Sequence, residues 1–119
     1  GWAAEFRDKG IAANALWPLT VIETAALKML DPDYGSDSRT PEIMADAAHI
    51  ILTKNSKEFS GNFVIDEIIL REHGQTEFDH YATRPGGKDM TIDLYIDDEI
   101  INLAKALKEA KSYNRNSKL

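Results

Sequence analysis

Acidic residues form the first group in this sequence whose types and spacing could do chemistry. Four of them fall at positions 1, 3, 7 and 12 of a calcium-binding loop within the stretch DPDYGSDSRTPE: Asp31, Asp33, Asp37 and Glu42. The middle of the stretch departs from that loop, because Gly35 stands where an oxygen ligand is needed and Ser36 stands where glycine is needed. A solvent-exposed loop that leads into a helix explains these residues better than a calcium site.

Two histidines, His73 and His80, lie near Glu77 and Asp79 and could bind a metal by residue type. Their spacing matches no ligand pair of a helix or a hairpin, and no second cluster supports them. We therefore predict surface histidines and no metal site. No Ser-His-Asp arrangement stands out. The absence of cysteine excludes disulfides, thiolate zinc sites and a cysteine nucleophile.

The last three residues match a targeting signal. As a free C-terminal tripeptide, Ser117-Lys118-Leu119 is the peroxisomal import address, and it follows a basic segment. Ordinary residue usage produces three specified residues at three positions about once in a few thousand chains. We therefore expect a peroxisomal import receptor as a partner and a peroxisomal location. A mitochondrial location stays open, because a transit peptide would lie upstream of Gly1.

Charge and composition argue against several classes of function. The 119 residues carry 14 Lys and Arg against 20 Asp and Glu, which makes a net charge of −6, and the pI is about 5.0. Nucleic acids and anionic membranes bind to a concentrated basic face, so we expect neither as a partner. No apolar run approaches the roughly 18 residues of a membrane-spanning helix, and no signal-peptide pattern is present. The helical pattern is already under way at Gly1, so we expect the protein to continue upstream.

Hydrophobic periodicity and turn residues predict alternating helices and strands. Residues 1–9 have apolar residues at helical spacing, and Gly10 stands where a helix takes a residue with positive φ. Residues 11–17 form a nearly continuous apolar run, which is typical of a short strand buried in a parallel sheet. Pro18 ends that strand, and a short helix follows within residues 19–30.

The middle of the chain repeats this order. Thr40 is expected to be the N-cap of a helix over residues 41–53, with Pro41 at its first position. Residues 62–65 are predicted to form another short strand. Asp66 is expected to cap the segment that ends at Gly74. A strand, a helix and a second strand in this order favour an α/β fold with a parallel sheet.

The last segment differs in charge, with one acid and five bases in residues 100–119. Asp97 or Asp98 is expected to cap an amphipathic helix. Its apolar side consists of four residues: Ile100, Leu103, Ala104 and Leu107. Three lysines lie where they would complement the helix dipole: Lys105, Lys108 and Lys111. The residues beyond Ser112 are expected to fray.

Three stretches resemble the C-terminal half of a short-chain dehydrogenase/reductase, over about residues 1–85. They are Asn14-Ala15 followed by Pro18 at the end of a strand, the helix that starts at Thr40-Pro41-Glu42, and Ser60-Gly61 before Phe63-Val64-Ile65-Asp66. The resemblance implies the C-terminal portion of a Rossmann-like, doubly wound parallel sheet. Such a sheet binds a nicotinamide cofactor, NADP or NAD, at the carboxyl ends of its strands. Residues 86–119 would then form an extension with an added C-terminal helix and the import tail.

The resemblance also implies where the cofactor and the substrate would bind. The segment after the first strand is expected to lie over the nicotinamide and to contact it through five residues: Pro18, Thr20, Val21, Ile22 and Thr24. The family usually has glycine after this proline and a threonine five residues beyond it, whereas here Leu19 follows and Thr24 is six beyond. The next helix and loop would form a substrate lid, in which four residues suit an apolar or acyl substrate: Leu27, Met29, Leu30 and Tyr34.

Two features of the catalytic family members are absent from the sequence. It has no Gly-x-Gly turn for the cofactor phosphates, and none of its four tyrosines begins a Tyr-x-x-x-Lys pair. We therefore expect no catalytic residue and no activity in this polypeptide alone. The parent protein would be an oxidoreductase that acts on an alcohol or carbonyl group and forms homo-oligomers.

Two alternatives remain open at this point. The first is a noncatalytic interaction domain on the same scaffold, which would differ from an enzyme in lacking the Tyr-x-x-x-Lys pair upstream. The second is a complete small α/β domain. The strand predicted at residues 11–17 disfavours this second alternative, because both of its faces are apolar and need neighbours that a short chain hardly provides.

Overall fold

The computed structural model describes residues 1–25, 29, 38–83, 92–93 and 96–117, and it describes residues 111–117 by their backbone. Some residues singled out from the sequence lie outside this part of the chain. They are the loop acids Asp31, Asp33 and Asp37, the lid residues Leu27, Leu30 and Tyr34, and the tail residues Lys118 and Leu119.

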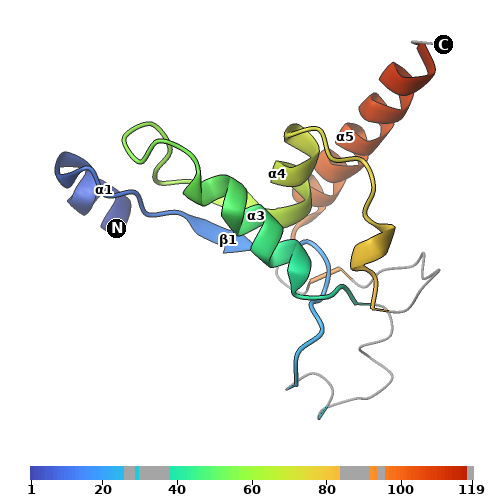
Figure 1. The fold of residues 1–119 in the computed structure, drawn as a ribbon, viewed down its shortest axis with the longest axis horizontal. Helices are drawn as coiled ribbons and strands as arrows, with labels where there is room; N and C mark the ends of the chain where they lie inside the picture. Colours follow the sequence, from blue (N-terminus) through green and yellow to red (C-terminus); the bar gives the residue numbers. More distant parts are fainter. Residues whose placement is uncertain (26–28, 30–37, 84–91, 94–95, 118–119) are drawn as a thin grey trace.

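Two short parallel strands and the helix that connects them form the centre of the fold (Figure 1). β1 (Ala15–Trp17) pairs in parallel with β2 (Phe63–Ile65), and Leu16 lies opposite Val64. α3 (Glu42–Leu52) lies in the connection, as a crossover between parallel neighbours requires. The predicted α/β class, both strands and this helix are confirmed.

β1 is shorter than the predicted run of residues 11–17. The reason lies in Asn14, whose side-chain Oδ1 accepts hydrogen bonds from the backbone N–H of Asn62 at 3.0 Å and from its side-chain amide at 3.1 Å. The Asn14 side chain thus accepts the Asn62 N–H, which a backbone carbonyl would accept in a longer strand. The regular ladder begins at Ala15.

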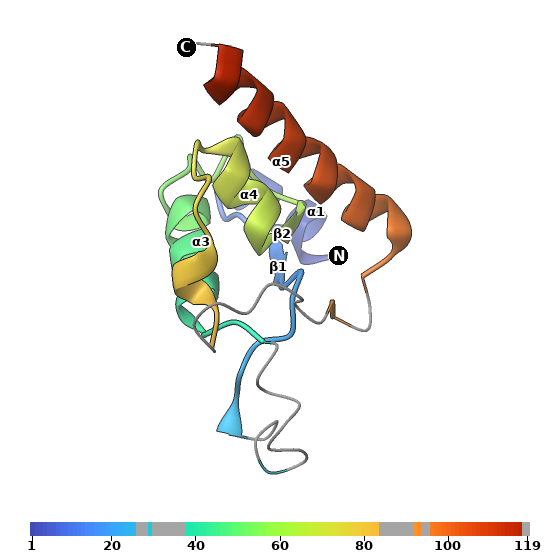
Figure 2. The same ribbon diagram turned by 90° about the vertical axis from the view of Figure 1, so that its right-hand side faces the viewer.

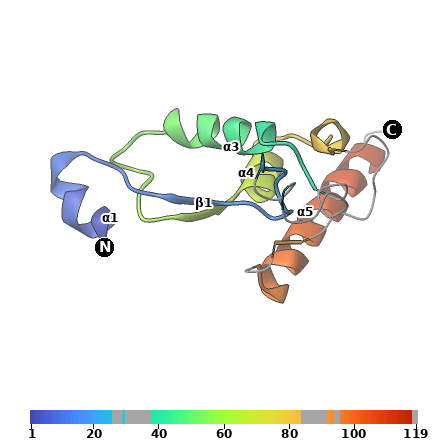
Figure 3. The ribbon, with the colours of Figure 1, turned by 90° about the horizontal axis from the view of Figure 1, so that it is seen from below.

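Helices cover both faces of the two strands. Successive residues of a strand point to opposite faces, so Val64 and Ile65 belong to different cores. Val64 packs on the α3 side with six other buried residues: Ile43, Ala47, Ile69, Leu70, Phe78 and Tyr81. Ile65 packs with Leu19, Ile68 and Ala104 on the side of α5 (Asp98–Ser117). Figures 2 and 3 show α3 and α5 on opposite sides of the strands, which is the layering of a doubly wound sheet.

α4 (Asp66–Glu72) follows β2 without a loop and is buried from Asp66 to Arg71. The chain then turns at Gly74 and runs through Phe78 into the 3₁₀ turn η3 (Asp79–Tyr81). The Tyr81 hydroxyl donates a hydrogen bond of 2.5 Å to Asp46 Oδ2 on α3. This bond fastens the segment after α4 to the helix that crosses over the sheet.

The first residues form α1 (Trp2–Phe6) and the 3₁₀ turn η1 (Arg7–Lys9), as the periodicity of residues 1–9 predicts. Gly10 has φ of 71° and its N–H donates to the Arg7 carbonyl. The predicted left-handed glycine at the end of this helix is therefore confirmed.

Of the three predicted helix caps, the structure confirms only the one on α5. Asp66 is the first residue of α4 and Ile65 is its N-cap, and Pro41, predicted at the first position of α3, is the N-cap of that helix. Asp97 Oδ1 accepts the Ile100 N–H at 2.9 Å, so the predicted cap of α5 is confirmed. The prediction of a Thr40 cap is wrong, because Thr40 Oγ1 is buried and makes no hydrogen bond within the described part of the chain. The Thr40 N–H is bonded to the Tyr81 carbonyl at 2.7 Å, which holds this residue against η3 instead.

The prediction that the chain frays beyond Ser112 is also wrong, because α5 continues to Ser117. Once a helix is nucleated, adding a residue costs little, so a polar end without apolar anchors can stay helical. The helix therefore reaches well past its contacts with α4 and β2. In the ranges that the structure describes, no helix is long and apolar enough to span a membrane.

Candidate functional site

The carboxyl ends of β1 and β2 meet at Asp66. This residue follows β2 directly and is fully buried, with none of its surface exposed. Its Oδ1 accepts the Leu19 N–H at 3.0 Å and the Glu67 N–H at 2.6 Å. The sequence predicted only a capping role for Asp66. In the structure α4 begins at Asp66 itself, and its carboxylate joins the ends of the two strands.

Burial raises the pKa of Asp66 to about 6 from its usual 3.8. Removal from water disfavours the charged form, and this cause outweighs the two backbone hydrogen bonds and the attraction of Arg39. The second carboxylate oxygen, Oδ2, makes no hydrogen bond to any residue described. The carboxylate is therefore held on one side only.

A buried ion network lies beside Asp66. Arg39 Nη2 lies 2.7 Å from Glu67 Oε1, and Arg71 Nε lies 3.3 Å from Glu67 Oε2. The ring of Phe78 packs against both guanidinium groups, with its centroid 5.5 Å from Arg39 and 4.3 Å from Arg71. The Glu67 carboxylate thus forms ion pairs with two buried guanidinium groups.

This network was not predicted from the sequence. The network combines Arg39 from the segment that leads into α3, Glu67 and Arg71 from α4, and Phe78 from the loop before η3, and no local motif links them. The available signal was the presence of charged residues inside the otherwise apolar stretch IDEIILR, which is unusual for a buried segment.

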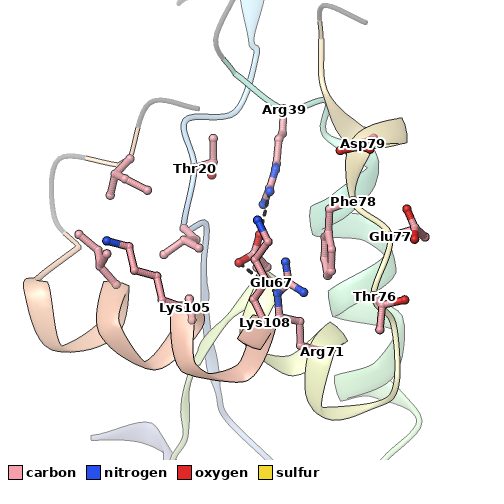
Figure 4. Close-up of a pocket in the computed structure, with 14 residues that line it drawn as sticks. Thr20, Arg39, Glu67, Arg71, Thr76, Glu77, Phe78, Asp79, Lys105 and Lys108 are labelled. Atoms are coloured by element: carbon pink, nitrogen blue, oxygen red, sulfur yellow. Dashed lines mark ion pairs between the residues drawn. The ribbon is translucent and has the colours of Figure 1, made fainter. Parts of the chain in front are cut away.

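The network forms one wall of a hollow of about 610 Å³ (Figure 4). The facing wall is α5, which contributes Ile101, Ala104, Lys105 and Lys108. Leu19 and Ile92 complete the apolar side next to Thr20, and residues 76–79, which include Phe78, form the rim. In Figure 4 the side chains of Arg39, Glu67 and Arg71 point toward one another, and Glu77 is directed away from them.

The segment predicted to contact a cofactor leaves β1 at the same edge of the strands. Three backbone hydrogen bonds fix its course: Asp93 N–H to the Leu19 carbonyl at 2.9 Å, Arg39 N–H to the Val21 carbonyl at 2.9 Å, and Glu23 N–H to the Arg39 carbonyl at 2.8 Å. This segment contains the five predicted contact residues: Pro18, Thr20, Val21, Ile22 and Thr24. Thr20 is buried, Thr24 is exposed and the other three are half-buried. Only Thr20 of these lines the hollow.

The other predicted sites are described only in part. Met29 is the described lid residue, and 87% of it is exposed. Ser117 is the last residue of α5, while its two neighbours in the import signal lie outside the described residues. Both His73 and His80 are exposed, and the described residues contain no group of three or more metal-binding side chains.

Several curated proteins with similar sequences carry the same name. The chain is 47% identical over 110 residues to hydroxysteroid dehydrogenase-like protein 2 of Xenopus laevis, a match that covers 92% of this chain and 26% of that protein. It is 50% identical over 99 residues to the human protein of the same name, with 82% and 23% covered. The chain therefore spans about a quarter of the length of the curated relatives it matches. No family model matches the chain.

Solved structures show the same relationship in three dimensions. A protein from Xanthomonas campestris assigned as a dehydrogenase has a TM-score of 0.74 and 45% identity, with 82% of this chain and 36% of that chain covered. A short chain dehydrogenase from Mycobacterium thermoresistibile has a TM-score of 0.69 and 42% identity, with 80% and 34% covered. These identities are high enough for the likeness to reflect common descent as well as a common Rossmann-like fold.

Proposed function

Because this chain belongs to the short-chain dehydrogenase/reductase family, we propose that it is part of an oxidoreductase that uses NADP or NAD. The substrate of this enzyme carries an alcohol or carbonyl group, and the bound cofactor supplies or accepts the hydride. The observation that carries the proposal is the parallel strand–helix–strand unit whose carboxyl edge continues into the fixed segment Pro18–Thr24. Open α/β sheets bind their ligands at this edge.

The residues present fit the nicotinamide end of such a cofactor. Asp66 accepts a hydrogen bond from the Leu19 N–H, and the backbone of Arg39 is hydrogen-bonded to the backbone of Val21 and Glu23. The backbone next to the proposed cofactor site is therefore ordered before binding. A preordered segment loses less conformational entropy when a ligand binds. The phosphate end needs a glycine-rich turn that this sequence does not contain. The proposed role of the chain is therefore to position the nicotinamide.

The substrate is proposed to be apolar or acyl, enclosed by the lid of residues 25–39. Met29 supports this, since it exposes a large apolar side chain next to the proposed cofactor segment in sequence. Residues 1–85 form the dehydrogenase part in this proposal, and residues 86–119 are its extension. The complete enzyme is proposed to be a homo-oligomer.

The proposed location is the peroxisome, reached through an import receptor that binds Ser117-Lys118-Leu119. A fluorescent protein fused upstream of the chain leaves this tail free, so microscopy can test it. Deletion of Leu119 is expected to move the fusion from peroxisomes to the cytosol. An unchanged distribution after the deletion would show that another signal, such as a mitochondrial one, directs the protein.

The cofactor role is tested on the protein translated from the complete transcript. Replacing the exposed Thr24 by valine removes its hydroxyl, and we expect about a tenfold higher KM for NADPH or NADH, the effect of one lost hydrogen bond. Thr53→Val is the matched control, because Thr53 is also exposed and its hydroxyl donates to the Ile50 carbonyl at the end of its own helix. Equal KM values for the two variants would show that the Thr24 hydroxyl does not bind the cofactor. A folded protein with no turnover at all would favour the noncatalytic interaction domain.

A further inference from the structure

The hollow between α4 and α5 has a charged part that hydride transfer does not require. Arg39 is only 8% exposed, yet its Nε and Nη1 make no hydrogen bond to the residues described, and Glu67 engages its Nη2 alone. Buried donors of a charged group normally find acceptors. This guanidinium therefore has unused capacity to bind an anion, on the wall of a cavity.

Two lysines on α5 face the same hollow. Lys105 and Lys108 are three residues apart and lie on one face of the helix together with Ile101 and Ala104. The dipole of α5 does not account for them, because the favourable effect is confined to the last turn and the helix continues to Ser117, more than two turns beyond Lys108. Their positive charges are therefore available to bind an anion in the hollow.

The hollow is polar at one end and apolar at the other. Along α5, apolar Ile101 and basic Lys108 are separated by roughly 10 Å at the usual helical rise. Leu19, Ile92 and Ala104 continue the apolar part, while Arg39 and Arg71 lie on the wall opposite the lysines. Glu77 and Asp79 occur only on the rim formed by residues 76–79. In Figure 4, Lys108 reaches toward the Arg39–Glu67–Arg71 network.

We propose that this hollow binds an amphipathic anion, a molecule with one carboxylate or phosphate head group and an apolar chain. The head group lies between Lys108 and the two arginines, with Lys105 adding positive charge from the same helix face, and the chain lies along Ile101, Leu19 and Ile92. The volume of about 610 Å³ is within the usual range of small-molecule sites. This site goes beyond the proposed oxidoreductase function and does not depend on it, since binding here needs neither a cofactor nor turnover.

Calorimetric titration of the protein at low salt and neutral pH tests the site. The probes are laurate, dodecyl phosphate, acetate and inorganic phosphate. We expect both long-chain anions to bind at least about tenfold more tightly than acetate or inorganic phosphate, because only they fill the apolar part. The tighter of the two long-chain probes identifies the head group. Equal binding of all four probes would overturn the amphipathic assignment.

The location is tested with Lys105→Gln/Lys108→Gln, a double variant of exposed residues that leaves the buried network intact. Its affinity for the long-chain anion should fall at least about tenfold, which corresponds to about 1.4 kcal/mol. Lys9→Gln/Lys57→Gln is the control, because it removes the same two charges from exposed positions outside the hollow. Circular dichroism verifies that both variants are folded. Unchanged affinity of the first variant, or an equal loss in the control, would overturn the proposal.

Discussion

Replacing Asp66 by asparagine should stabilise the protein at neutral pH, although this residue joins the two strands. Asparagine retains the Oδ1 that accepts the Leu19 and Glu67 N–H groups. It also places an amide where Oδ2 makes no hydrogen bond within the described structure. The substitution therefore removes the cost of a buried charge without removing the hydrogen bonds.

The expected size of the effect follows from the pKa of Asp66, which is raised from 3.8 to about 6. Since the folded state binds the proton more tightly, stability falls as the pH rises from about 4 to about 6 and stays lower above that range. One pKa unit corresponds to 1.36 kcal/mol, so the ionised carboxylate costs about 3 kcal/mol at neutral pH. Asp66→Asn should recover most of this amount there, and almost none below about pH 4.

Urea unfolding of the wild type and of Asp66→Asn across this pH range measures the effect. The difference between their free energies of unfolding is the informative quantity, because other titrating groups contribute equally to both. Asp8→Asn is the control for removing a carboxylate, since Asp8 is exposed and its replacement should change the free energy of unfolding little. A difference for Asp66→Asn that does not change with pH, or a less stable variant at neutral pH, would refute the reasoning.

Three further substitutions test other parts of the structure by the same unfolding measurement. Glu67→Gln leaves two buried guanidinium groups without their carboxylate, so it should cost about 3–5 kcal/mol, and a loss below 1 kcal/mol would contradict the burial of this network. Tyr81→Phe should cost about 1 kcal/mol or more through the lost bond to Asp46, and in the wild type burial and that bond should hold the pKa of Tyr81 above its usual range in a spectrophotometric titration. Asp97→Ala should cost about 1 kcal/mol by removing the cap of α5, with a matching loss of helical circular dichroism; an unchanged spectrum and stability would exclude the cap.

The local elements of the fold could be predicted because short-range patterns determine them. The apolar runs before Pro18 and after Asn62 predicted β1 and β2, and the periodicity after Pro41 predicted α3. Gly10 predicted the end of the first helix, because glycine easily adopts the positive φ that is common at that position. The layers then follow from burying the apolar faces of these elements.

The charged part of the site could not be predicted, because it depends on contacts between residues far apart in the sequence. Arg39 and Glu67 meet only once α3 has crossed over and β2 has paired with β1. The wrong prediction of a Thr40 cap has the same cause. Threonine is a residue type that suits an N-cap, but the Thr40 N–H is hydrogen-bonded to the distant Tyr81 carbonyl. Lys105 and Lys108 seemed to complement a helix end only because the helix was expected to stop earlier.

The most direct test of the oxidoreductase proposal is hydride transfer itself. The protein translated from the complete transcript is incubated with nicotinamide cofactor that carries deuterium at the transferred position, together with apolar ketones of increasing chain length. Mass spectrometry of the alcohol product should find one deuterium on the former carbonyl carbon. The 119-residue chain is the negative control, because its sequence has no Tyr-x-x-x-Lys pair or Gly-x-Gly turn. Absence of labelled alcohol from the folded longer protein, with NADPH and with NADH, would contradict the proposed function.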